Sequence, residues 1–215
     1  MSQRFASFIS YLFHPLLFST YGAIFIVAAN PHLFAEYHIK TQILWVIITF
    51  IFTFLCPIVW IVMMKKLELI SDYKLSNPKE RIIPYVAVAT FYMWTYRLFK
   101  PTPELTQFSN QVISMMMLGA AVAIFIGFFI NIFRKISLHA IGAGCMLGLA
   151  LVMIHLSDYD LKFFFVFVIL AGGLIGTSRL LLGVHKQSEI YAGYLVGFIG
   201  QFFSFTLLPL IFRQY

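Results

Sequence analysis

Seven long apolar segments divide this chain, and they constrain its fold more than any other feature. They lie at roughly 8–29, 43–64, 82–96, 112–133, 140–154, 163–177 and 190–212. A helix needs about 20 residues to cross the ~30 Å hydrocarbon core of a bilayer, because each residue rises ~1.5 Å. Four segments reach that length, whereas 82–96, 140–154 and 163–177 are shorter. We therefore expect six or seven transmembrane helices, the segment 82–96 being the one that decides the number.

The composition leads to the same fold class. Of the 215 residues, 61% are hydrophobic and 11% are charged, against about 45–50% and 25% in soluble globular proteins. These values exclude a soluble globule, a disordered chain and a disulfide scaffold. Cys56 and Cys145 both lie in apolar segments and are interpreted as small core residues. We expect residues 1–215 to form one all-α integral membrane domain.

The chain is basic, with 15 Lys and Arg against 8 Asp and Glu and a formal net charge of +7. One interpretation is topological, since Lys and Arg concentrate in loops beside membrane spans. The other is that part of this charge binds an anion such as phosphate; we expect no nucleic-acid partner. With seven spans, the N-terminus shares one membrane face with the loops 65–81, 134–139 and 178–189. Which face of the membrane that is stays open, because anion-binding cations do not report topology.

Small residues predict close packing of the last three helices. Three Gly-x-x-x-Gly pairs occur, namely Gly144/Gly148, Gly172/Gly176 and Gly193/Gly197. Glycines at this spacing let two helix backbones approach closely in lipid. We interpret all three pairs as packing positions.

The loop after the sixth segment contains a group of reactive side chains. It reads Ser178-Arg179-x5-His185-x3-Glu189. Residues four apart share a helix face, so the Glu189 carboxylate can accept a hydrogen bond from one ring nitrogen of His185. The other nitrogen is then free to act as a nucleophile or base. The alternative is an ordinary ion pair in a solvated interfacial loop.

This loop resembles the third signature of the type 2 phosphatidic acid phosphatase superfamily. The first signature, Lys-x6-Arg-Pro, is similar to Lys74-x6-Arg81, which Ile82 follows here in place of Pro. The second, Pro-Ser-Gly-His, is similar to Ile136-Ser137-Leu138-His139. The order and rough spacing of the three motifs also agree. The resemblance covers about residues 65–205.

The resemblance implies a role for each matched residue. Lys74, Arg81 and Arg179 would hold the phosphoryl oxygens, and Ser137 would hydrogen-bond to the phosphate. His185 would be the nucleophile that forms a phosphohistidine, and Glu189 would orient it. His139 would be the general acid. The family's helical core is the implied fold, and no metal or other cofactor is implied.

The implied activity is hydrolysis of a lipid phosphate or diphosphate at the membrane. Candidate substrates are phosphatidate, phosphatidylglycerol phosphate, a polyprenyl diphosphate and a lipid A phosphate. Leu138 in place of Gly and the missing prolines leave one alternative open, a catalytically weakened member that acts as a binding or scaffold protein. A lipid phosphotransferase is a separate alternative. A transporter unrelated to the family is a third. The compact, loop-poor layout is typical of the bacterial inner membrane.

Lys135 and His14 lie outside the three motifs, and we interpret them differently from the motif residues. We expect Lys135 to be a loop cation at the interface, with a phosphate contact as the alternative. We expect His14-Pro15 to kink the first span, with the imidazole satisfied locally.

Overall fold

A computed structural model describes residues 1–73, 78–100, 108–157 and 159–206. Most of these residues are helical, and none of them lies in a strand. The main helices are α1 (Gln3–Leu12), α2 (Phe18–Ala29), α4 (Ile39–Phe50), α5 (Cys56–Lys66), α6 (Ile82–Phe99), α7 (Phe108–Phe133), α8 (Leu138–Leu156), α9 (Lys162–Leu181) and α10 (Gln187–Thr206). Short helical pieces join them, namely η1 (Pro15–Leu17), α3 (Pro31–Phe34), η2 (Ile51–Leu55) and η3 (Pro78–Arg81).

Among the described residues, five helical stretches are long and apolar enough to cross a membrane, as expected of an integral membrane protein. They are Gln3–Ala29, Ile39–Lys66, Gln111–Phe133, Leu138–Leu156 and Lys162–Leu181. Large apolar side chains face outward on them: Phe163 is 89% exposed and Leu170 is 67% exposed. A soluble protein rarely exposes such a continuous apolar surface, whereas lipid covers it at no cost.

The three short apolar segments form helices longer than the segments themselves. The segments 82–96, 140–154 and 163–177 become α6, α8 and α9, of 18, 19 and 20 residues. Polar residues at their ends, such as His139 and Arg179, continue the helix because the backbone hydrogen bonds do not depend on side-chain polarity. These three segments were therefore predicted too short.

Proline breaks or distorts the first two long stretches. His14 is extended (ψ 137°), and Pro15 starts η1, so α1 ends before it and α2 begins after it. The His14 Nδ1 accepts a hydrogen bond from the Leu16 N–H, which confirms the expected kink and the local satisfaction of the imidazole. The second stretch contains the π-helical turn η2 immediately before Pro57; proline cannot donate to the helical ladder, and such turns accommodate the missing bond.

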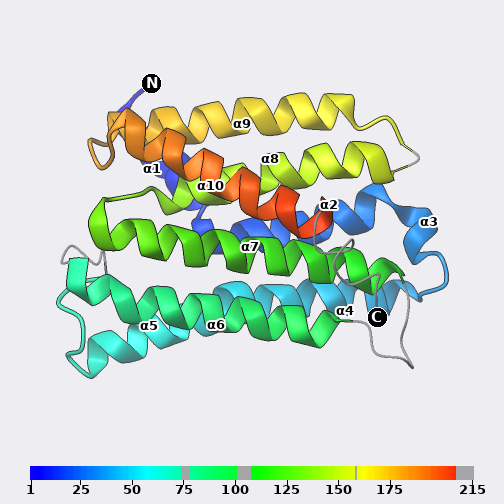
Figure 1. Cartoon of the computed structure of the whole chain (residues 1–215), viewed down its shortest axis with the longest axis horizontal. Coiled ribbons are helices and arrows are strands. Elements are labelled where there is room, and N and C mark those ends of the chain that lie inside the picture. Colours follow the sequence, from blue (N-terminus) through cyan, green and yellow to red (C-terminus); the bar gives the residue numbers. More distant parts are fainter. Residues whose placement is uncertain (74–77, 101–107, 158, 207–215) are drawn as a thin grey trace.

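The helices lie side by side along the long axis of the molecule (Figure 1). One end of the bundle gathers the N-terminus and the connections α5–α6, α7–α8 and α9–α10. The opposite end holds α3 and the α8–α9 connection. The loops expected on one face of the membrane therefore lie at one end of the bundle.

Glycines bring α8 and α10 into backbone contact. A Cβ added at Gly144 would meet the Tyr194 carbonyl, and one added at Gly197 would meet the Ile141 carbonyl and the Cys145 N–H. On α9, the space beside Gly176 is taken by the Tyr194 ring, whose hydroxyl donates to the Gly172 carbonyl at 2.5 Å. The predicted close packing is confirmed for α8 and α10, whereas the pair Gly172/Gly176 on α9 brings no neighbouring backbone close, because a Cβ added at Gly172 meets only the Leu147 side chain at 4.0 Å.

We expect Gly197→Ala to destabilise the protein by about 1–3 kcal/mol, the usual cost of forcing extra volume into a packed interior. Neither neighbouring backbone group can move without shifting α8. Thermal unfolding in detergent, followed by loss of the monodisperse peak in size-exclusion chromatography, measures the effect. Gly173→Ala is the matched control, because nothing lies within 4 Å of a Cβ added there. Equal unfolding temperatures for both variants would contradict the proposed backbone contact.

Candidate functional site

A cavity of about 800 Å³ opens among the helices and contains most of the residues that the motifs predicted. Its lining includes Arg81, His139, Arg179 and His185. Lys135 and His14 border the same space. None of the described residues that line it is a carboxylate. The rest of the wall is largely apolar and includes Val88, Met116, Ile124 and Leu149. Arg81, Lys135 and Arg179 lie at or beside helix ends at one end of the bundle, whereas Met116, Ile124 and Leu149 lie inside α7 and α8. The cavity is therefore cationic toward that end and apolar deeper among the helices.

The end of α9 places Arg179 and His185 on the same cavity. Gly183 adopts a left-handed conformation (φ +65°), which glycine reaches without steric cost. The Gly183 N–H donates to the Leu180 carbonyl and the Val184 N–H to the Arg179 carbonyl, the pattern that closes a helix end. The chain thus turns back immediately after α9. His185 follows two residues later, within reach of the cavity that Arg179 borders.

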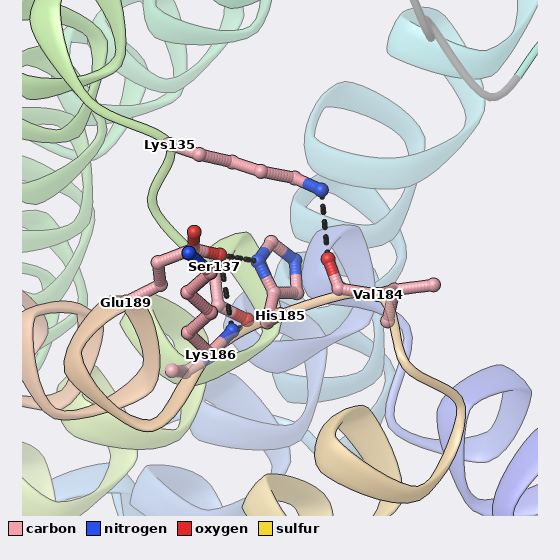
Figure 2. A network of polar contacts seen from close by, with 7 residues as sticks. Lys135, Ser137, Val184, His185, Lys186 and Glu189 are labelled. Atoms are coloured by element: carbon pink, nitrogen blue, oxygen red, sulfur yellow. Dashed lines mark hydrogen bonds and ion pairs between the residues drawn. The ribbon is translucent and has the colours of Figure 1, made fainter.

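His185 and Glu189 form the predicted pair (Figure 2). Their Nδ1 and Oε2 atoms are 2.8 Å apart, and the side chains are only 10% and 18% exposed. The Glu189 carboxylate also accepts a bond from the Lys186 backbone N–H at 3.3 Å, which caps the start of α10. Two bonds therefore hold the carboxylate. Because a carboxylate only accepts, the Nδ1 atom of His185 carries the proton and Nε2 presents a lone pair.

The surroundings of His185 keep its ring neutral. Burial lowers the pKa of His185 below its ordinary value of 6.5, and the positive charges of Arg179 and Lys135 act in the same direction. The hydrogen bond to Glu189 opposes them and raises the pKa, but the net shift is downward. Near pH 7 the imidazole is therefore unprotonated, as a nucleophile requires.

His139 and Arg179 meet at one residue of the first helix, Ser10. The His139 Nε2 lies 3.1 Å from the Ser10 carbonyl oxygen, and the Arg179 Nη1 donates to the Ser10 hydroxyl at 3.1 Å. Ser10 belongs to none of the three motifs, and the sequence did not identify it as a site residue. Its partners His139 and Arg179 lie 129 and 169 positions away, so no local pattern indicates these contacts.

Ser137 has a different position from the other motif residues. It is fully buried, and its hydroxyl oxygen accepts from the Ala140 N–H at 3.4 Å as the cap of α8. Its backbone N–H donates to the Glu189 carbonyl, which joins the starts of α8 and α10. Its neighbours Ile136 and Leu138 border the cavity instead. The predicted phosphate contact of Ser137 stays a prediction.

The first motif is described in part. Arg81 lies at the junction of η3 and α6 and borders the cavity. Lys74 lies outside the described residues. The structure therefore brings together His139, Arg179, His185, Glu189 and Arg81, which come from three separate parts of the chain.

Two residues outside the motifs also belong to this region. The Lys135 Nζ donates to the Val184 carbonyl at 2.7 Å, directly beside His185 (Figure 2). The His14 ring lies 6.2 Å from the ring of His139, measured between centroids. The sequence alone assigned neither residue to the site. The position of Lys135 next to the second motif could have indicated a role there, whereas nothing in the sequence indicated one for His14.

No group of three or more His, Cys, Asp and Glu side chains that could hold a metal ion occurs in the described part of the chain. Compared with protein-family models, with curated protein sequences and with solved structures, the chain matches none.

Proposed function

We propose that this protein is a membrane-embedded phosphatase that hydrolyses a lipid phosphate or diphosphate through a phosphohistidine intermediate. The observation that carries the proposal is the two-part cavity. Arg81, Arg179 and Lys135 give one region positive charge, and the remaining wall is largely apolar. An amphiphile with an anionic head and an apolar tail matches both regions. Phosphatidate, phosphatidylglycerol phosphate, a polyprenyl diphosphate and a lipid A phosphate all belong to this class.

The first step forms the covalent intermediate. The lone pair on the His185 Nε2 attacks phosphorus, and the bond between phosphorus and the leaving oxygen of the lipid breaks. A protonated His139 gives its proton to that oxygen, an effect of about 10²–10⁴ in rate. Arginine suits the phosphoryl oxygens because its planar fork offers paired donors. Charge stabilisation of this kind is most of what catalysis of phosphoryl transfer requires.

The second step releases phosphate. Water attacks phosphorus, the bond to His185 breaks, and the neutral His139 takes the proton of the water. Glu189 holds the Nδ1–H of His185 throughout and stabilises the charge that the ring acquires. Lys74 would add a further cation, as the resemblance implies.

The position of the site in the bundle favours a lipid substrate. His139 is in the first turn of α8 and Arg179 in the last turn of α9. Helices of 19 and 20 residues match the thickness of the hydrocarbon core at ~1.5 Å per residue. Their terminal residues then lie at the depth of lipid headgroups. We further propose that α6 and α10 also cross, which makes seven spans of a phosphatase-like core in a bacterial inner membrane.

Replacement of His185 tests the proposal directly. We expect His185→Ala to lower kcat by at least ~10³-fold, because the nucleophile is lost. Phosphate release from a panel of lipid phosphates in mixed micelles, measured with EDTA present, reports the activity. His155→Ala is the matched control, because His155 lies at the other end of α8.

Three outcomes would contradict this mechanism. Activity that survives in His185→Ala would exclude a phosphohistidine at this residue. A folded wild-type protein that binds the lipids but releases no phosphate would favour the scaffold alternative, and release only in the presence of a second lipid alcohol would favour a phosphotransferase.

The pH profile of kcat/KM tests the pair formed by His185 and Glu189. Activity needs neutral His185, so it falls as the pH drops through the pKa of that ring; because the pKa is lowered, we expect the acid limb below pH 6.5. In Glu189→Gln the bond that raises the pKa is lost, so the limb should move to lower pH. The rate at pH 7 should also fall, since the ring is no longer held by a carboxylate.

Glu36→Gln serves as the control for this profile, because Glu36 is an exposed acid in the α3–α4 connection. We expect its acid limb to coincide with that of the wild type. A limb that moves to higher pH in Glu189→Gln would contradict the proposed pairing.

A further inference from the structure

The first helix contacts two residues of the candidate site through Ser10. Ser10 lies in the last turn of α1 and borders the cavity. Its hydroxyl accepts a hydrogen bond from the Arg179 Nη1 on α9 at 3.1 Å. Its carbonyl oxygen lies 3.1 Å from the Nε2 of His139 on α8. One residue thus joins two site residues that belong to different helices.

The kink at His14-Pro15 makes the Ser10 carbonyl available. The last four carbonyls of a helix have no partner inside the helix. Because α1 ends at Leu12, Ser10 is among those four residues. At the depth of a membrane such a carbonyl needs another donor, and His139 supplies it. The break in the first span therefore leaves the Ser10 carbonyl free to accept a hydrogen bond from His139.

The contact with the carbonyl defines the state of the His139 ring. A carbonyl oxygen only accepts hydrogen bonds, so the Nε2 atom of His139 must carry a hydrogen. In the neutral ring, Nδ1 then has the lone pair. Proton transfer by His139 takes place at Nδ1 as long as the bond to Ser10 persists.

The contact with the hydroxyl orients Arg179. The Nε atom of this guanidinium is buried and has no hydrogen-bond partner among the described residues. The bond from Nη1 to Ser10 is therefore important for the direction of the planar fork. An arginine that binds phosphate through two parallel donors depends on that direction.

We propose that Ser10 is a positioning residue of the site, an inference that rests on the proposed phosphatase activity. In the protonated ring of His139 both nitrogens carry hydrogen; the Ser10 carbonyl holds the Nε2–H, which leaves the Nδ1–H to give its proton to the leaving oxygen. The Ser10 hydroxyl orients Arg179 toward the phosphoryl group. The first helix is thus part of the active site and not only of the bundle.

Kinetics of three variants test the role of the hydroxyl. Ser10→Ala removes the acceptor for Arg179, and we expect KM for the lipid phosphate to rise about 10-fold with a smaller change in kcat. Ser10→Thr keeps a hydroxyl and should restore KM to within about 3-fold of the wild type. Thr90→Ala is the matched control, because the Thr90 hydroxyl donates to the Val86 carbonyl of its own helix and Thr90 does not border the cavity. Equal effects of Ser10→Ala and Thr90→Ala, or a higher kcat in Ser10→Ala, would overturn the proposal.

Nuclear magnetic resonance of protein labelled with ¹⁵N-histidine tests the carbonyl contact without any turnover. The His139 signals, assigned by their loss in His139→Ala, should show a protonated Nε2 throughout, and an unprotonated Nδ1 at a pH where the ring is neutral. The opposite tautomer would overturn the role of the Ser10 carbonyl. If the wild type releases no phosphate from any lipid, the phosphatase proposal fails, whereas the tautomer still reports whether Ser10 holds His139.

Discussion

The backbone contact between α8 and α10 is the interaction on which the rest of the site depends. Gly144 and Gly197 have no side chain, so the backbones of the two helices can lie in contact at these positions. At the same end of the pair, the Ser137 N–H reaches the Glu189 carbonyl. The start of α8, with His139, and the start of α10, with Glu189, are thereby held beside each other. In lipid, where apolar surfaces gain little by leaving the solvent, such close van der Waals packing is the main source of helix association.

Interruptions of regular helix supply much of the polar chemistry. The break at His14-Pro15 frees the Ser10 carbonyl, and the left-handed Gly183 returns the chain so that His185 meets the cavity. Each interruption leaves backbone groups that need partners in a medium without water. Here the partners include side chains of the candidate site. Unpaired backbone groups at a helix interruption need hydrogen-bond partners. Polar side chains of the candidate site therefore lie beside these interruptions.

Much of the fold could be predicted because it is local. Where the structure describes them, the apolar segments form helices, interrupted at His14-Pro15 in the first and by a π-helical turn in the second. His185 and Glu189 pair because residues four apart face the same way on a helix. The helix lengths were underestimated, since polar end residues such as His139 continue a helix without contributing to an apolar segment. Ser137 illustrates the limit for the site: its motif predicts a phosphate contact, whereas its hydroxyl caps α8. A motif identifies a residue but not the direction of its side chain.

The sequence by itself determined the membrane class, the helical segments, the kink at Pro15 and the spacing of His185 and Glu189, because hydropathy, proline geometry and helical periodicity act over a few residues. The tertiary structure decided that one cavity joins Arg81, Lys135, Arg179 and the histidines, and that Ser10 contacts His139 and Arg179. Those contacts span more than a hundred residues. They follow from how whole helices pack, and helix packing depends on all facing side chains at once.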